Sequence, residues 1–73
     1  MNEALNSLVA EWRILRKDLA TAREHQMPAT MKCIVDEIQV INSRIDAAIS
    51  CFRTVKERVA ARNYVNALKD GML

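Results

Sequence analysis

The chain has 73 residues and a formal net charge of +2, and it contains a single glycine and a single proline. This length allows one small domain, residues 1–73, and so few turn-forming residues leave almost no material for strands. The small net charge does not by itself indicate a nucleic-acid partner. The composition therefore predicts an all-α protein.

A first amphipathic helix is expected over residues 3–25. Asn2, Asn6 or Ser7 is available as its N-terminal cap. Apolar side chains recur there at alternating steps of three and four, which is the period of a helix that buries one narrow stripe. The members of this stripe are Leu5, Leu8, Trp12, Leu15, Leu19 and Ala22. Trp12 is best interpreted as a large core anchor, with a binding hot spot as the alternative.

The segment 25–28, His25-Gln26-Met27-Pro28, breaks this helix. Proline cannot continue a helix from behind, but it suits the first position of a new one. Pro28 is therefore expected to start a second helix. Such a short connection makes the two helices antiparallel neighbours, as in a helical hairpin.

The second helix is expected to run over residues 28–69. Its apolar stripe has the same spacing and consists of Met31, Ile34, Ile38, Ile41, Ile45, Ala48, Phe52, Val55 and Val59. After Val59 the pattern changes, and a new stripe appears on another side of the helix: Ala61, Val65, Leu68 and Met72. Either the helix breaks near Asn63, or its end meets a second surface.

The two expected helices differ in length, and this predicts a binding surface. At ~1.5 Å per residue the first helix covers about 33 Å and the second up to about 63 Å. Phe52, Val55 and Val59 would then lie beyond the reach of the first helix. They are expected to dock a second copy or another protein, so that the hairpin is completed as a helical bundle, a dimer or larger. Arg53, Lys56 and Arg58 would form its basic rim and steer an acidic partner.

The function expected from this pattern is a small, non-enzymatic protein-binding module, such as an adaptor, a chaperone-like protein, or an inhibitor or regulator. Nucleic-acid binding through the basic C-terminal third is the alternative, although Tyr64 is the only residue there that could stack on a base. An enzyme is the third possibility. Arg44-Ile45-Asp46, followed by Arg53, Lys56 and Arg58, resembles the helix of all-helical chorismate mutases. That resemblance implies a dicarboxylate bound between helices, but the rest of the pattern is missing.

No catalytic residue, cofactor or metal site is expected. His25 is the only histidine, and Cys33 and Cys51 lie too far apart in the sequence for a chelating motif. On a continuous helix the two cysteines could not form a disulfide, and they are expected to be small packing residues. Isolated thiols suit a reducing compartment. No signal-peptide pattern and no apolar run of ~18 residues is present, so the expected protein is cytoplasmic with no membrane partner.

The run Ile45-Asp46-Ala47-Ala48-Ile49, continuing to Phe52 and Val55, resembles the second helix of the small co-chaperones of type III secretion needles. The resemblance covers about a third of the chain. It implies a two-helix hairpin that clamps a helical-repeat chaperone, so that the pair holds a needle subunit unpolymerised. In this chain the turn is built on Pro28, and a basic segment follows Val59.

Overall fold

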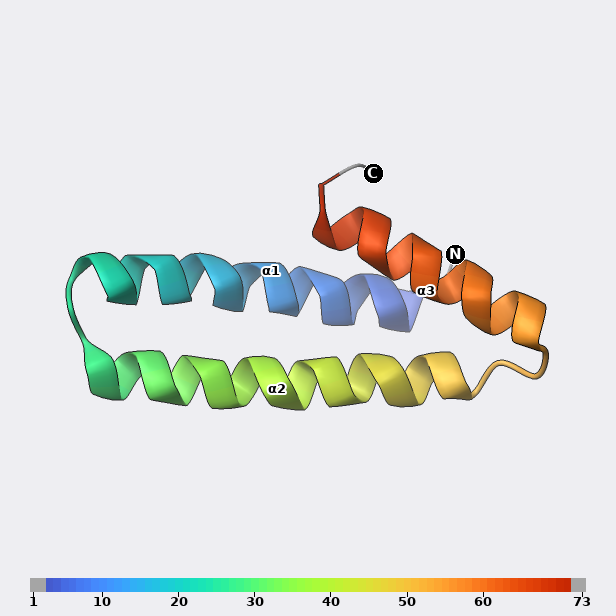
Figure 1. Ribbon diagram of the computed structural model, residues 1–73, viewed down its shortest axis with the longest axis horizontal. Coiled ribbons are helices and arrows are strands. Elements are labelled where there is room, and N and C mark those ends of the chain that lie inside the picture. The colour runs from blue at the N-terminus through green and yellow to red at the C-terminus, as the bar shows by residue number, and fades with distance from the viewer. Residues whose placement is uncertain (1–2, 72–73) are drawn as a thin grey trace.

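A computed structural model describes residues 3–71, which form three helices and no strand. The helices are α1 (Glu3–Glu24), α2 (Pro28–Ser50) and α3 (Val55–Lys69). In the ribbon, α1 and α2 lie side by side and are joined at one end by a short connection, while α3 lies against the other end of the pair (Figure 1). The expected all-α class is confirmed. The cap candidate Asn2 and the stripe residue Met72 lie outside the described residues.

The connection between α1 and α2 closes α1 with a backbone motif. Gln26 adopts a left-handed conformation with φ of 53°. The Gln26 N–H donates to the Arg23 carbonyl at 3.1 Å, and the Met27 N–H donates to the Ala22 carbonyl at 3.0 Å. These two bonds satisfy carbonyls that have no partner inside the helix, as in a Schellman motif. Pro28 is the first residue of α2, as the sequence predicted.

The predicted continuous helix over residues 28–69 is wrong, because α2 ends at Ser50 and α3 begins at Val55. At the end of α2, the Cys51 N–H donates to the Ala48 carbonyl and the Phe52 N–H donates to the Ile49 carbonyl. Such i→i−3 bonds tighten the last turn of a helix. The break comes about ten residues before the predicted position near Asn63.

Thr54 caps the start of α3 with its side chain. The Thr54 hydroxyl oxygen accepts the Glu57 N–H at 3.1 Å, and the same hydroxyl donates to the Glu57 carboxylate at 3.0 Å. This Thr-x-x-Glu pattern satisfies a donor that the first turn would otherwise leave unpaired. The Arg58 guanidinium then donates to the Phe52 carbonyl at 2.8 Å. These hydrogen bonds stabilise the turn between α2 and α3.

The core lies where the three helices meet. Its buried residues are Leu5, Val9, Ile41, Ile45, Ile49, Ala61 and Val65. Leu19 and Ile38 are also buried, so the expected core is confirmed at Leu19, Ile38, Ile41 and Ile45. Leu15 is only partly buried. The stripe that begins at Ala61 meets α1 and α2 within the same chain, so the second surface that the sequence allowed for is an intrachain one.

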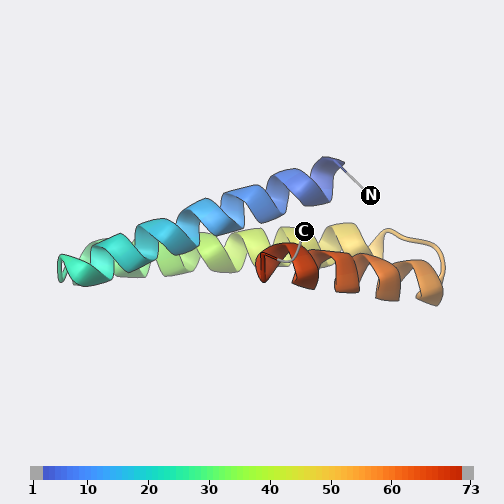
Figure 2. The ribbon, with the colours of Figure 1, turned by 90° about the horizontal axis from the view of Figure 1, so that it is seen from above.

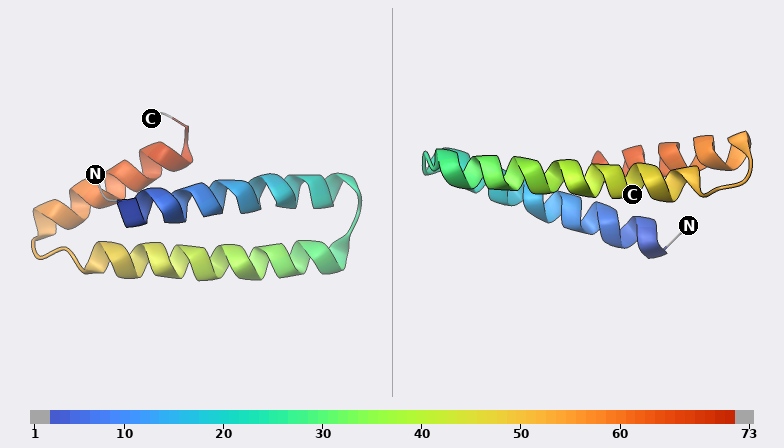
Figure 3. Two further views of the ribbon diagram at one scale, coloured as in Figure 1. Left: turned by 180° about the vertical axis from the view of Figure 1, so that it is seen from behind. Right: turned by 90° about the horizontal axis from the view of Figure 1, so that it is seen from below.

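The third helix covers one side of the α1/α2 pair. Seen from above, α3 runs alongside the C-terminal half of α2, while α1 diverges to the other side (Figure 2). Seen from behind, α1 and α2 face the viewer and α3 lies behind them (Figure 3). We call the side that carries α3 the covered face and the other side the open face.

Candidate functional site

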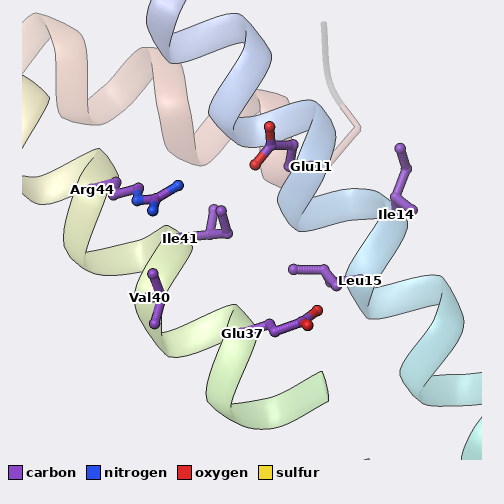
Figure 4. Close-up of a pocket in the computed structure, with 7 residues that line it drawn as sticks. All are labelled: Glu11, Ile14, Leu15, Glu37, Val40, Ile41 and Arg44. Carbon is purple, nitrogen blue, oxygen red and sulfur yellow. The ribbon is translucent and has the colours of Figure 1, made fainter. Parts of the chain in front are cut away.

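A groove runs between α1 and α2 on the open face, with a volume of about 430 Å³. Four apolar residues line it, Ile14 and Leu15 from α1 and Val40 and Ile41 from α2. Three charged residues join them, and the full set is Glu11, Ile14, Leu15, Glu37, Val40, Ile41 and Arg44. Figure 4 shows Leu15 and Ile41 pointing toward one another across this groove.

The groove exposes large β-branched side chains. Ile14 is 60% exposed and Val40 is 50% exposed, whereas Ile41 beside them is buried. Leaving one such side chain in water instead of burying it forgoes roughly 1.5–3 kcal/mol. A contiguous exposed apolar patch with a polar rim is typical of a protein-binding surface. The open face is therefore the strongest candidate for a docking site.

The charged side chains at the groove form no ion pair with another described residue. In residues 3–71 the one ion pair joins Asp46 and Arg62, which lie elsewhere. Glu37 and Arg44 project from α2 on either side of Val40, and Glu11 projects from α1 (Figure 4). These charges are free to pair with a partner that covers the apolar floor.

The covered face is different, because its polar side chains bind one another. Arg62 pairs with Asp46 at 2.7 Å, Lys69 Nζ donates to Asn42 Oδ1 at 2.9 Å, and the Tyr64 hydroxyl donates to Asn6 Oδ1 at 2.6 Å. At about 100° per residue, Val40 lies about 160° round α2 from Asn42. The groove and α3 therefore occupy opposite sides of α2.

Trp12 belongs to the covered face. Its ring packs against the core, with Lys69 Nζ 4.7 Å and the Arg16 guanidinium carbon 5.7 Å from the ring centroid. Both distances are within the range of a cation–π interaction. Burial lowers the pKa of Lys69, the Arg62 charge lowers it further, and Asp46 acts in the opposite direction. These contacts support the interpretation of Trp12 as a core anchor.

The predicted docking residues do not continue one stripe, because the helix that would carry them is broken. Phe52 is partly buried and packs against the core, so the prediction that it lacks an intrachain partner is wrong. Val55 and Val59 lie on α3 and are 67% and 52% exposed. Arg53 and Lys56 are exposed, and Arg58 is partly buried.

Three of these six residues do meet at a second groove of about 390 Å³ between α2 and α3. Its lining consists of Ile49, Ser50, Val55, Arg58, Val59, Arg62 and Asn63. Both arginines are already engaged, Arg58 with the Phe52 carbonyl and Arg62 with Asp46. This groove is thus more polar and less available than the groove on the open face.

The intrachain contacts of the basic residues give little support to the nucleic-acid and enzyme alternatives. Arg58, Arg62 and Lys69 are bonded to groups in the chain, which leaves Arg53 and Lys56 as the unengaged basic side chains of α3 and its approach. Asp46 faces α3, whereas Arg44 lines the opposite groove. The residues that carry the chorismate mutase resemblance therefore do not converge on one pocket.

Both cysteines are free and exposed, so the expectation that they are small packing residues is wrong. In the described part of the chain there is no group of three or more potential metal-ligating residues. The same residues include no helix that is both long and apolar enough to cross a membrane.

Five residues of the open groove were not predicted to form a docking surface: Glu11, Ile14, Glu37, Val40 and Arg44. The available signal was the presence of Ile14 and Val40 away from both apolar stripes, because large apolar residues that gather on an outward surface are typical of an interaction site. None of them belongs to an apolar stripe, and only Arg44 belongs to a motif considered above. Their proximity depends on how α1 and α2 pair.

Comparison with known proteins adds no relative: no family model matches this chain, and no curated protein or solved structure matches it either.

Proposed function

We propose that this chain is a non-enzymatic protein-binding module, of the adaptor, chaperone-like or regulator kind, whose open groove docks a helix of a partner. In this proposal α1 and α2 form an antiparallel helical hairpin that α3 supports on one face. A partner helix, from a second copy or another protein, completes the bundle on the other face.

The observation that carries the proposal is the exposure of Ile14 and Val40 at one groove, above the apolar floor of Leu15 and Ile41. A groove between two helices, with apolar residues along its length and charges at its edges, matches the way an amphipathic helix is bound. Burying such side chains is the main source of affinity, and the rim charges set orientation and partner choice.

A pair of matched variants tests this groove against the surface that the sequence predicted. Val40 and Val59 are almost equally exposed, at 50% and 52%, but Val59 lies on α3 at the other groove. Tagged wild type, Val40→Asp and Val59→Asp would be expressed in the source cells, and bound proteins would be quantified by mass spectrometry. Circular dichroism would verify that each variant is folded.

The proposal expects Val40→Asp to lose the captured protein and Val59→Asp to retain it, because a carboxylate in the apolar groove would have to be desolvated without a partner. If Val40→Asp retains the captured protein and Val59→Asp loses it, the binding surface lies on α3. Loss of bound RNA on replacing Arg53 and Lys56 by Ala, with no effect of Val40→Asp, would favour the nucleic-acid alternative.

A further inference from the structure

We infer that the occupant of the open groove is a second copy of this chain, bound through an isologous contact in which α2 crosses its counterpart in antiparallel orientation near Val40 and Ile41. This inference rests on the proposed function and names the partner at that site. It is carried by the arrangement of charge and size along the open face of α2.

The charge pattern of this face is complementary to itself. Glu37 and Arg44 both line the groove and are one heptad apart, with Val40 and Ile41 midway between them. A two-fold axis through that midpoint places Glu37 of each copy beside Arg44 of the other, because residue i then meets residue j and j meets i. Two symmetry-related ion pairs would then lie on either side of the apolar contact at Val40 and Ile41.

Neither Glu37 nor Arg44 forms an ion pair within residues 3–71, although Glu11 lines the same groove. By contrast, Asp46 and Arg62 on the covered face are paired at 2.7 Å. The two side chains extend from α2 into the groove (Figure 4). An approaching copy can therefore engage them without first breaking an intrachain contact.

The sizes of the side chains also suit this axis. The same symmetry places Cys33 of one copy beside Ala48 of the other, and both are small residues. Small residues on both sides let two helices approach closely on either flank of the Val40 contact. Ile14, on the α1 side of the groove, would be covered by the same contact.

The open face is close in area to one side of a standard dimer interface. The 23 residues of α2 span about 35 Å, and two helices of about 10 Å diameter side by side present a face of roughly 700 Å². A standard interface buries about 800 Å² on each partner. Most of the open face would have to be covered, which is the geometry of a four-helix arrangement built from two hairpins.

Charge reversal gives a test that only a self-complementary contact can pass. Sedimentation equilibrium would compare five samples: wild type, Glu37→Arg, Arg44→Glu, the double variant, and an equimolar mixture of the two single variants. Protein concentrations from about 5 to about 200 μM would be used, because this range spans the affinity of transient dimers. Arg53→Glu, an exposed reversal away from the groove, is the matched control. Circular dichroism would verify the helical content of each sample.

Wild type and Arg53→Glu should sediment at twice the monomer mass of 8.3 kDa. Each single variant should weaken dimerisation by at least about tenfold, because like charges then face each other at two symmetric positions. The double variant should recover the dimer. The mixture should also recover it, since one chain then supplies only basic and the other only acidic side chains at positions 37 and 44.

The inference is overturned if wild type remains monomeric at the highest concentration, or if the single variants dimerise as wild type does. It is equally overturned if the mixture fails to recover the dimer. A monomeric wild type whose Val40→Asp variant still loses a captured protein would assign the groove to a different protein, so the proposed function would survive without this inference.

Discussion

The two faces of the α1/α2 pair differ in what their side chains contact. On the covered face, Ala61 and Val65 are fully buried, and Asp46 and Asn42 each bind a side chain of α3. On the open face, Ile14 and Val40 remain exposed, and Glu37 and Arg44 have no ion-pair partner among residues 3–71. Both faces belong to the same two helices, so the difference arises from the presence of α3 on one side only.

The third helix, α3, covers one side of the α1/α2 pair, and no helix of the described residues covers the other side. Val9 and Ile49, which lie beside the predicted stripes, are buried in the cluster that contains Ala61 and Val65. Both α1 and α2 thus have a second apolar side, which packs against α3. The groove at Val40 offers a comparable apolar surface in the opposite direction, and a helix from outside would complete it.

The largest change in the free energy of unfolding is expected for a substitution in the core, compared with one on the open face. Ile45 is 1% exposed, and Ile45→Ala should cost about 3–4 kcal/mol, since it removes buried methylene groups and leaves a cavity. Val40→Ala on the same helix should cost less than about 1 kcal/mol, because half of that side chain is already in water.

Urea melts followed by circular dichroism would compare these two variants. Both would be made in the Arg44→Glu background, which limits self-association. Equal losses for Ile45→Ala and Val40→Ala would show that Val40 is as buried as the core and would remove the distinction between the faces.

A smaller effect is expected on the covered face. Val65 is fully buried on α3, and Val65→Ala should cost about 2 kcal/mol while loosening α3 from α1. Val59→Ala, on the same helix but half exposed, is the control and should cost little. Hydrogen exchange of α3 amides and the emission wavelength of Trp12 would report the loosening. Unchanged exchange in Val65→Ala would mean that α3 is not held by this contact.

The smallest effect concerns the start of α3. Thr54→Ala removes the hydroxyl that accepts the Glu57 N–H, and it should cost about 1 kcal/mol. Thr54→Ser keeps a hydroxyl and should retain most of that stability. If Thr54→Ala melts as wild type does, then the packing of Ala61 and Val65 alone fixes the position of α3.

The sequence was sufficient for the helical class and for most of the core. Alternating steps of three and four placed Ile38, Ile41 and Ile45 in the interior, and Pro28 marked the start of α2. The break after Ser50 was missed because the apolar spacing continues formally through Phe52 and Val55. The cap sequence Thr54-x-x-Glu57 was the local signal that should have outweighed it.

The candidate site was less accessible from the sequence. Val55 and Val59 are exposed on α3, and their predicted link to Phe52 depended on an unbroken helix. The groove on the open face combines residues from α1 and α2 that are more than twenty positions apart, such as Ile14 and Val40. Periodicity reports which face of one helix is apolar, but it does not report which faces of two helices remain uncovered.

In the proposed dimer the open face, and not α3, meets a second copy at Val40. Cysteine cross-linking tests it most directly. Cys33 and Cys51 are exposed and would first be replaced by Ser. Val40→Cys or the equally exposed Val59→Cys would then be introduced, and each protein would be oxidised at micromolar concentration. A two-fold axis near residue 40 brings the two new thiols close enough for a disulfide. The account predicts a disulfide-linked dimer for Val40→Cys and mainly monomer for Val59→Cys, and the opposite result would contradict it.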